Sequence, residues 1–191
     1  QDLPGVRLAA LCRKRIGEGF GALPTPEIPV YGDYHDLIAD PAVQAIVVVT
    51  PPSLCREICL AAVKAGKPLL IEKPLAETGR DARAMVAAAE AANLLLMTAQ
   101  TLRFDRTILF LKEQLPEIGQ LRYATFTSRI ETKASAQALS PMPGQRGALL
   151  ELGVHLLDLV PFLTGESIVD VRCEMDQCPP LAPETLALVQ A

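Results

Sequence analysis

Leu69-Leu70-Ile71-Glu72-Lys73-Pro74-Leu75 is the stretch that decides the expected fold of this 191-residue chain. A short apolar run ends abruptly in two charged residues, and a proline then prevents the strand from continuing. This pattern predicts a buried parallel strand over Pro68 to Ile71 that brings charged side chains to its carboxyl edge. Open α/β sheets bind their ligands at that edge. Lys73 is therefore either placed to meet a small polar substrate or a solvated lysine that pairs with Glu72.

Strands and helices alternate on both sides of this stretch. The runs 45–49 and 94–99 are short and apolar, which predicts two more buried strands. The Ala-rich segments between the strands predict helices, one from an N-cap at Ser53 through Ala65 and one from Thr78 or Asp81 to Ala92. Short strand and helix periods require right-handed crossovers, so the chain is predicted to contain a Rossmann-type parallel sheet of the α/β class.

A basic run follows the first predicted strand, Val6 to Cys12. The residues Arg13, Lys14 and Arg15 come directly after it. At the end of the second strand of a dinucleotide-binding sheet, an acidic residue accepts from the ribose 2′-hydroxyl, whereas an arginine accommodates a 2′-phosphate. The run is either a solvated turn or, if this is that second strand, an indication that Arg13 favours NADP over NAD.

The segment Gly17 to Ala22 matches the pattern G-x-G-x-x-A. That pattern binds phosphate only between a strand and a helix, where the helix N-terminus faces the pyrophosphate. Here a basic segment precedes it and the proline-rich Leu23 to Pro29 follows, which forbids a helix. We expect a loop and not a phosphate-binding turn.

The pattern changes after Gln100, which predicts a second domain beginning near residue 101. Asp105 to Leu115 is predicted to be helical. Gln120 to Glu131 alternates polar and apolar residues, as is typical of a strand in an antiparallel sheet with one exposed face. Lys133 to Gly147 is predicted to be a loop. The second domain is therefore expected to be α+β, with an open, largely antiparallel sheet.

The stretch from Gly147 to Thr164 predicts a buried helix that is apolar apart from one stripe. At about 100° per residue, Glu151, His155 and Asp158 share that stripe. A buried row of titratable groups has two explanations. It is either a structural network in which a carboxylate fixes the imidazole, or an acid/base group that faces a cleft.

Composition excludes several classes of function. The net charge is −4 and no basic patch carries interleaved aromatic residues, so no nucleic-acid partner is expected. No apolar run approaches membrane-spanning length, and the first residues lack the pattern of a signal peptide. The five cysteines are odd in number and have no framework spacing, which favours buried reduced thiols and a cytoplasmic location. With only two histidines and no ligand spacing, no metal site is expected.

Glu72-Lys73-Pro74 at a strand end, followed by a helix with the pattern acid-x-x-x-His-x-x-Asp, resembles a known enzyme family. Together with Thr50-Pro51-Pro52 and Leu102-Arg103-Phe104, it is similar to the glucose-fructose oxidoreductase, inositol dehydrogenase and rhizopine-catabolism (Gfo/Idh/MocA) oxidoreductases. The resemblance covers residues 6 to about 172. It implies a Rossmann domain that binds NAD or NADP, and a second domain that supplies the substrate pocket and the oligomer interface.

The resemblance also implies roles for individual residues. It implies that Lys73 is the catalytic lysine positioned by Pro74, and that His155 is the base on the substrate hydroxyl while hydride leaves the same carbon. Glu151, where the family usually has Asp, would be one methylene longer and would orient or bind substrate. The remaining implied residues are Arg103 and Asp158 for substrate, and Arg13, Thr50, Pro51, Pro52, Glu72 and Lys73 for the cofactor.

The family's first strand and glycine-rich turn have no counterpart in this sequence. We therefore expect residues 1–100 to be an N-terminally incomplete dinucleotide-binding domain and residues 101–191 a C-terminally incomplete substrate and oligomerisation domain. The leading hypothesis is an NAD(P)-dependent oxidoreductase of a sugar, polyol or related hydroxy or carbonyl compound, assembled as a homodimer or homotetramer. The alternative is a binding or regulatory relative that keeps the scaffold without turnover.

Overall fold

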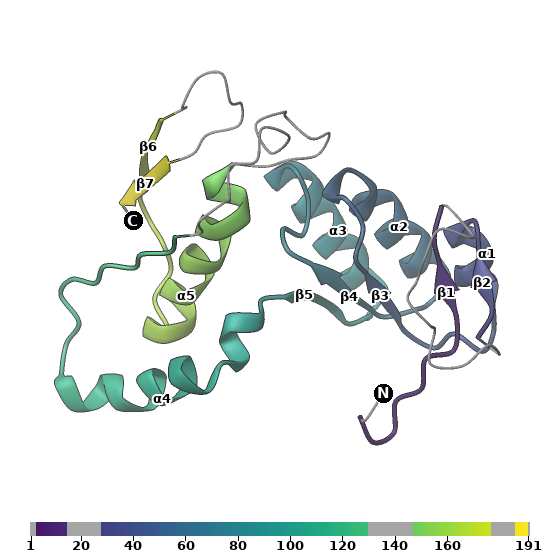
Figure 1. Ribbon diagram of the computed structural model, residues 1–191, viewed down its shortest axis with the longest axis horizontal. Helices are drawn as coiled ribbons and strands as arrows, with labels where there is room; N and C mark the ends of the chain where they lie inside the picture. The colour runs from purple at the N-terminus through teal and green to yellow at the C-terminus, as the bar shows by residue number, and fades with distance from the viewer. Residues whose placement is uncertain (1–2, 15–27, 130–146, 177–185, 191) are drawn as a thin grey trace, which may run out of the picture. The chain divides into compact units, whose positions relative to one another are not determined.

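The computed structural model describes residues 3–14, 28–129, 147–176 and 186–190 of the chain (Figure 1). The chain forms two compact units, residues 1–99 and 100–191, which are described separately below. The segment Gly17 to Ala22 and all but the last residue of the predicted loop from Lys133 to Gly147 lie outside the described residues. No helix in the described part of the chain is long and apolar enough to cross a bilayer.

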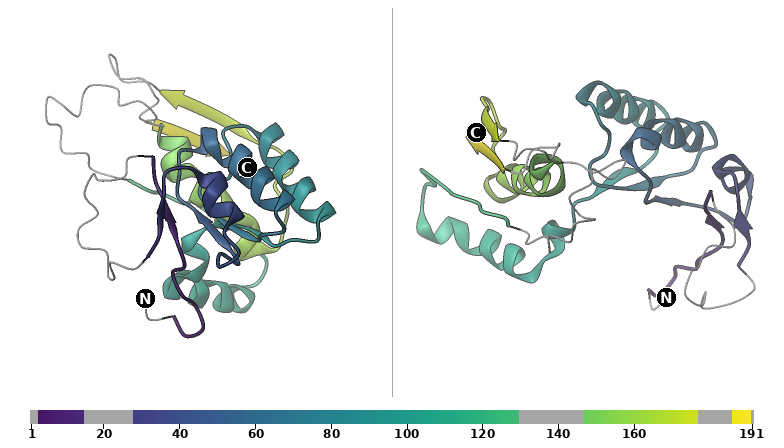
Figure 2. Two further views of the ribbon diagram at one scale, coloured as in Figure 1. Left: turned by 90° about the vertical axis from the view of Figure 1, so that its right-hand side faces the viewer. Right: turned by 45° about the horizontal axis from the view of Figure 1, so that its top comes forward.

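The first unit is built from parallel strands and covering helices, as the sequence predicted. Strands β1 and β2 pair with each other, and β3, β4 and β5 form a second parallel sheet in that order. Helices α2 and α3 lie on the same face of the second sheet (Figures 1 and 2). The elements are β1 (Leu11–Cys12), β2 (Val30–Tyr31), α1 (Tyr34–Ala39), β3 (Ile46–Val48), α2 (Pro52–Lys64), β4 (Leu69–Glu72), α3 (Gly79–Ala91) and β5 (Leu96–Ala99).

Strand β4 lies at the centre of this unit because it pairs on both sides. Its register sets Ile71 opposite Val48 in β3 and opposite Thr98 in β5. The side chains of Ile71, Cys59 in α2 and Met85 in α3 have no exposed surface. A strand buried between two neighbours and under helices must be apolar along its length, which explains the run that predicted it.

Several boundaries in this unit differ from the prediction, most of them by one or two residues, and the largest differences concern β1 and the start of α2. Strand β1 covers only Leu11 and Cys12, because these are the residues of the predicted strand that find a partner in β2. Helix α2 begins at Pro52 with Pro51 as the N-cap, so the predicted N-cap at Ser53 is wrong. Proline is well suited to the first helical position, since its φ is already helical and its missing N–H would have no partner there.

The other helix ends follow the local chemistry of the sequence. The Thr78 hydroxyl accepts a hydrogen bond from the Asp81 N–H at 3.1 Å and caps α3, as predicted. Gly66 has a φ of 72° just after α2, a conformation that glycine adopts without steric cost. Helix α1 is capped by Asp33, and the Tyr34 hydroxyl donates to the Glu57 carboxylate on α2. That bond raises the pKa of Tyr34 to about 12.

The cysteines only partly follow the expectation of buried thiols. Cys55 and Cys59, one helical turn apart in α2, are buried, and burial raises the pKa of Cys59 to about 11. Cys12 and Cys173 are exposed, so the prediction is wrong for these two side chains. Both lie in strands that pair on one side only, where a small side chain is left at the surface. Cys178 lies outside the described residues.

The second unit combines helical segments with an antiparallel pair of strands. Strands β6 and β7 pair with each other in antiparallel orientation, as a small sheet. The elements are the 3₁₀ turns η1 (Thr101–Phe104) and η2 (Leu115–Ile118), α4 (Arg106–Gln114), the π-helical turn η3 (Leu149–Gly153), α5 (Val154–Thr164), β6 (Arg172–Asp176) and β7 (Leu186–Gln190).

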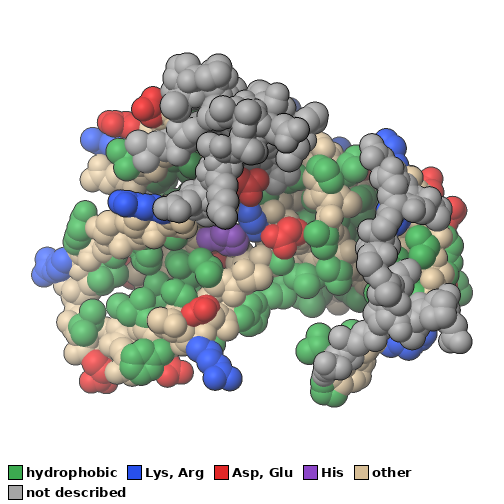
Figure 3. Space-filling model, in the orientation of Figure 1, with side chains coloured by type: hydrophobic (Ala, Val, Ile, Leu, Met, Phe, Trp, Pro, Cys, Tyr) green, Lys and Arg blue, Asp and Glu red, His purple; other side chains and the backbone are tan. Residues whose placement is uncertain are grey.

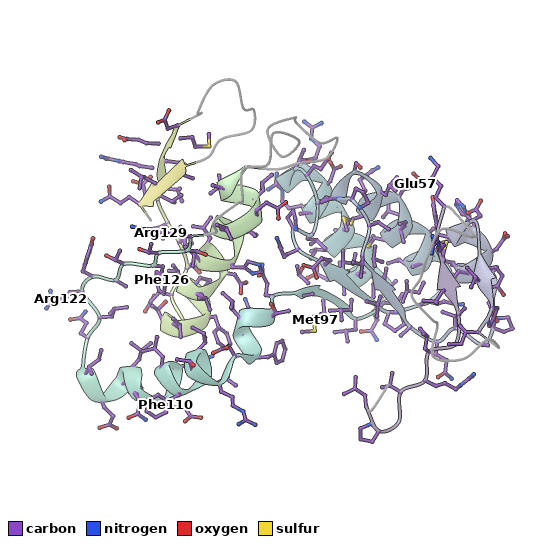
Figure 4. The ribbon with its side chains drawn as sticks, viewed as in Figure 1. Glu57, Met97, Phe110, Arg122, Phe126 and Arg129 are labelled. Carbon is purple, nitrogen blue, oxygen red and sulfur yellow. The ribbon has the colours of Figure 1, made fainter. Side chains whose placement is uncertain are left out.

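The strand predicted over Gln120 to Glu131 does not form in its described part. Residues 120–129 have no strand assignment, because alternation supplies a suitable face but not a partner, and β6 and β7 pair with each other. Within this segment Phe126 is half-buried and lies near α5 (Figure 4). Phe110 of α4, by contrast, points away from α5 and is 62% exposed.

The helix predicted from Gly147 to Thr164 is also modified. A π turn precedes the α-helical part, and the side chains around Glu151, His155 and Asp158 are half-buried instead of buried. Leu159 and Leu163 are the residues of α5 that are buried. The prediction that these three polar side chains form a buried stripe is therefore wrong. The polar groups lie at the boundary of the unit, where their desolvation costs less.

Adjacent valines of β3 provide a matched test of the core. Val48 is 3% exposed and Val47 is 68% exposed. Val48→Ala should lower the free energy of unfolding by about 2 kcal/mol, because it removes two buried methyl groups and leaves a cavity. Val47→Ala should cost less than about 1 kcal/mol, mainly through strand propensity. Urea unfolding followed by circular dichroism measures both, and equal losses would contradict the assigned side-chain alternation.

Candidate functional site

Lys73 directly follows β4 at the carboxyl edge of the parallel sheet, as the sequence predicted. Glu72, the last residue of the strand, pairs with Ala99 of β5. Lys73 is half-buried, Pro74 is buried, and the peptide bond between them is cis. An ammonium group in this position lies at the edge where open parallel sheets bind ligands.

The turn Thr50-Pro51-Pro52 reaches the same edge from β3. Cys55 anchors it from the first turn of α2, with its Sγ 3.8 Å from both the Thr50 Oγ1 and the Pro51 carbonyl oxygen. Proline has no side-chain acceptor, so the N-cap leaves the first N–H groups of α2 without a capping side chain. A helix N-terminus at a strand end attracts anions. The sequence predicts that Thr50, Pro51 and Pro52 lie at the cofactor site, and the structure places them at this edge.

Arg13 is the first residue after β1, as expected of a residue at the carboxyl end of that strand. Its backbone N–H donates to the Tyr31 carbonyl oxygen of β2 at 3.0 Å, so the parallel pairing continues up to Arg13. Lys14 is exposed, and Arg15 lies outside the described residues. Of the two described cations, Arg13 is the one that directly follows the strand and is half-buried.

In the second unit His155 is bonded to a residue that sequence reasoning missed. The Nδ1 of His155 lies 3.0 Å from the Oε1 of Gln100. Gln100 immediately follows β5 and precedes η1, and His155 is the second residue of α5. The signal available in the sequence was a polar side chain at the carboxyl end of an apolar strand, the same signal that drew attention to Lys73.

Asp158 pairs with Arg103. The Arg103 Nε and Nη2 donate to the two carboxylate oxygens of Asp158, each at 2.7 Å. This hydrogen bonding raises the pKa of Arg103, and the Asp158 side chain is 16% exposed. The guanidinium carbon also lies 5.2 Å from the centre of the Phe162 ring, on whose face the Lys112 ammonium sits at 3.8 Å. The pair joins η1 to α5 with the strong geometry of a bidentate ion pair.

Glu151 lies in η3 and not in the regular part of the helix. A π turn contains wider i to i+5 hydrogen bonding, so it changes the angular spacing between Glu151 and His155 from that of a continuous α-helix. Of the three residues predicted to share one α-helical stripe, His155 and Asp158 therefore have α-helical spacing, and Glu151 does not. Gly153 closes the turn tightly, because a Cβ there would lie 2.9 Å from Leu149 Cδ1.

The predicted residues therefore fall into two sets. The first unit places Arg13, Thr50, Pro51, Pro52, Glu72 and Lys73 at the carboxyl ends of its parallel strands. The second unit brings together Arg103 with Asp158, and His155 with Gln100. Over the described ranges, no cluster of three or more His, Cys, Asp or Glu side chains could hold a metal ion.

A double-mutant cycle tests the Arg103–Asp158 pair. Arg103→Met, Asp158→Asn and the double variant should give a coupling energy of about 1–2 kcal/mol in urea unfolding, since the pair is bidentate and partly buried. The Arg56–Asp81 ion pair, 3.2 Å long with side chains 52% and 35% exposed, is the matched control. Its coupling should stay below about 0.5 kcal/mol. Similar coupling energies for both pairs would mean that the bidentate, partly buried geometry of the Arg103–Asp158 pair does not strengthen it.

Comparison with known proteins gives three relevant similarities. The chain is 31% identical over 189 residues to inositol 2-dehydrogenase of Paracoccus denitrificans, covering 97% of this chain and 55% of that protein. It is 31% identical over 141 residues to levoglucosan dehydrogenase of Pseudarthrobacter phenanthrenivorans, covering 70% and 36%. A solved structure of a probable dehydrogenase from Thermotoga maritima superimposes with a TM-score of 0.67 at 29% identity, covering 77% and 44%.

The chain thus spans roughly half or less of the length of these relatives. The model of one protein family matches residues 1–100, which contain both described parallel sheets. That family is described as an oxidoreductase family with an NAD-binding Rossmann fold. Together with Lys73 at the carboxyl edge of that sheet, this match shows that the chain belongs to the Gfo/Idh/MocA oxidoreductase family.

Proposed function

We propose that the protein is an NAD(P)-dependent oxidoreductase that transfers hydride between a nicotinamide cofactor and a sugar, polyol or related hydroxy or carbonyl compound. The observation that carries the proposal is the half-buried Lys73 at the carboxyl end of β4, in a chain that belongs to this family. The names of the inositol and levoglucosan dehydrogenases support the substrate class.

The chain's own residues would carry the proton chemistry. His155 would take the proton from the substrate hydroxyl through Nε2, since Nδ1 is bonded to Gln100. Lys73 would donate a hydrogen bond to the same substrate oxygen and stabilise the negative charge that develops on it. Its positive charge would also help to keep a neighbouring base unprotonated. The nicotinamide, when bound, supplies the acceptor for the hydride.

The remaining residues would position these groups. The pair of Arg103 and Asp158 would fix η1 against α5 and contribute polar groups to the substrate site. Glu151 would bind or orient the substrate from the π turn. Thr50, Pro51, Pro52 and Glu72 would line the cofactor site.

We further propose that the enzyme acts in the cytoplasm as a homodimer or homotetramer, assembled through the second unit. Apolar side chains reach the surface of that unit over α4 (Figure 3). Phe110, Tyr123 and Val169 of the same unit are 62%, 84% and 94% exposed. Exposed aromatic side chains are enriched at protein–protein interfaces, which supports this proposal.

The role of Lys73 can be tested by substitution in the full-length protein. Lys73→Ala should reduce kcat by at least about 1,000-fold, because the charge on the reacting oxygen loses its donor. Binding of NADH or NADPH, followed by the fluorescence of the reduced cofactor, should change less than about threefold. Lys64→Ala, at the exposed end of α2, is the control and should leave both quantities unchanged.

Equal loss of turnover and cofactor binding in Lys73→Ala would mean that the lysine is structural. A full-length protein that binds neither NADH nor NADPH would instead favour a regulatory relative without turnover. These two outcomes separate the failure of the residue assignment from the failure of the proposed activity.

A second substitution tests the choice of cofactor. We propose that NADP is preferred, because Arg13 lies at the end of β1, where a guanidinium would pair with the 2′-phosphate. Arg13→Asp should weaken NADPH binding by about 10- to 100-fold, consistent with the loss of a charged hydrogen bond, and weaken NADH binding much less. An unchanged ratio of the two dissociation constants would remove Arg13 from the cofactor site.

A further inference from the structure

We infer that Gln100 is a positioning residue that holds His155 in the tautomer with its proton on Nδ1. This leaves the lone pair on Nε2, the nitrogen that the proposed reaction uses. The inference rests on the proposed function for its catalytic meaning. Its structural content, the tautomer itself, can be measured without any turnover.

The atoms in contact decide the tautomer. The Gln100 atom that lies 3.0 Å from His155 Nδ1 is the carbonyl oxygen Oε1. An amide oxygen only accepts hydrogen bonds, so Nδ1 must be the donor and carry the proton. In a neutral imidazole the other nitrogen, Nε2, is then unprotonated. One hydrogen bond of ordinary net strength biases such an equilibrium by about three- to tenfold.

The type of residue at position 100 also matters. A carboxylate in this place would stabilise the positively charged imidazolium and so disfavour the form that can accept a proton. The amide of Gln100 orients the ring without adding a charge. The nearest carboxylate on the same helix, Asp158, is held by the Arg103 guanidinium with two bonds of 2.7 Å. The positive charge of Arg103 therefore compensates its negative charge beside the imidazole.

A second contact fixes the distance between the two segments. Gln100 and Arg103 are three residues apart, as are their partners His155 and Asp158. The Arg103 N–H donates to the Gln100 carbonyl oxygen at 3.1 Å, which ties the two residues together at the start of η1. The ion pair thus holds η1 against α5. Gln100 then accepts the hydrogen bond from Nδ1 of His155, about one helical turn from Asp158. Removing the Gln100 amide leaves the ion pair in place, so the fold should survive.

Nitrogen NMR of the protein labelled with ¹⁵N-histidine measures the tautomer directly. The signals that disappear in His155→Asn identify the ring, and spectra are recorded at a pH where the imidazole is neutral. In the unmodified protein, Nδ1 should give the shift of a protonated nitrogen and Nε2 that of an unprotonated one. In Gln100→Met, which keeps the side-chain length without the acceptor, both shifts should move toward the average of two exchanging tautomers.

Gln100→Glu restores an acceptor oxygen and should restore the Nδ1-protonated spectrum. Gln114→Met, the same change at the exposed end of α4, is the control and should leave the spectrum unaltered. A proton on Nε2 in the unmodified protein, or an unchanged spectrum in Gln100→Met, would overturn the inference.

Turnover then separates this inference from the proposed function. Gln100→Met should lower kcat by about 1.5- to 2-fold with little change in KM, because loss of a three- to tenfold bias lowers the active tautomer from about 75–90% to about half. The expected NMR result in a protein without dehydrogenase activity would uphold the tautomer and refute the function. Dehydrogenase activity in a protein whose His155 carries its proton on Nε2 would uphold the proposed function and refute the tautomer.

Discussion

The constraint on which the first unit depends is the burial of β4 between two parallel neighbours. A strand with partners on both sides and helices over one face is apolar until its last residue, where a charged side chain can reach solvent. Ile71 is fully buried, and Glu72 and Lys73 follow at the point where the strand ends. The strands β3 and β1, which pair on one side only in the described sheets, are also followed by turn or charged residues, Thr50-Pro51-Pro52 beyond Val49 and Arg13 directly after β1. Burial of β4 therefore places the charged residues of this segment at the carboxyl edge of its sheet.

The second unit brings its functional groups together by a different means. Its candidate residues lie on η1 and α5, and side-chain contacts hold these two segments together. The bidentate pair of Arg103 and Asp158 supplies direction as well as attraction, since a guanidinium and a carboxylate meet in one plane. Phe162 packs beside the guanidinium and limits its rotation. This arrangement allows a neutral amide to control an imidazole on a helix that is distant in sequence.

Local chemistry made the first unit largely predictable from the sequence. Apolar runs, the cap at Thr78 and the glycine at 66 act within a few residues, so strands and helices could be located without knowing their partners. Pairing over long separations could not be predicted in the same way. The pattern of Gln120 to Glu131 suits a strand, but the strands that pair in this unit are β6 and β7. The polar character of Asp158 and His155 suggested a site, whereas their partners Arg103 and Gln100 depended on the tertiary fold.

The π turn before α5 has a consequence for how such a helix can change during evolution. The interval between His155 and Asp158 belongs to a regular helix and is fixed by the contacts to η1. The interval between Glu151 and His155 includes the wide turn, where one inserted or deleted residue is accommodated locally. The position of the Glu151 carboxylate can thus change without a change in the position of the His155 imidazole. The position of the Glu151 carboxylate can therefore vary between related chains while the spacing of His155 and Asp158 stays the same.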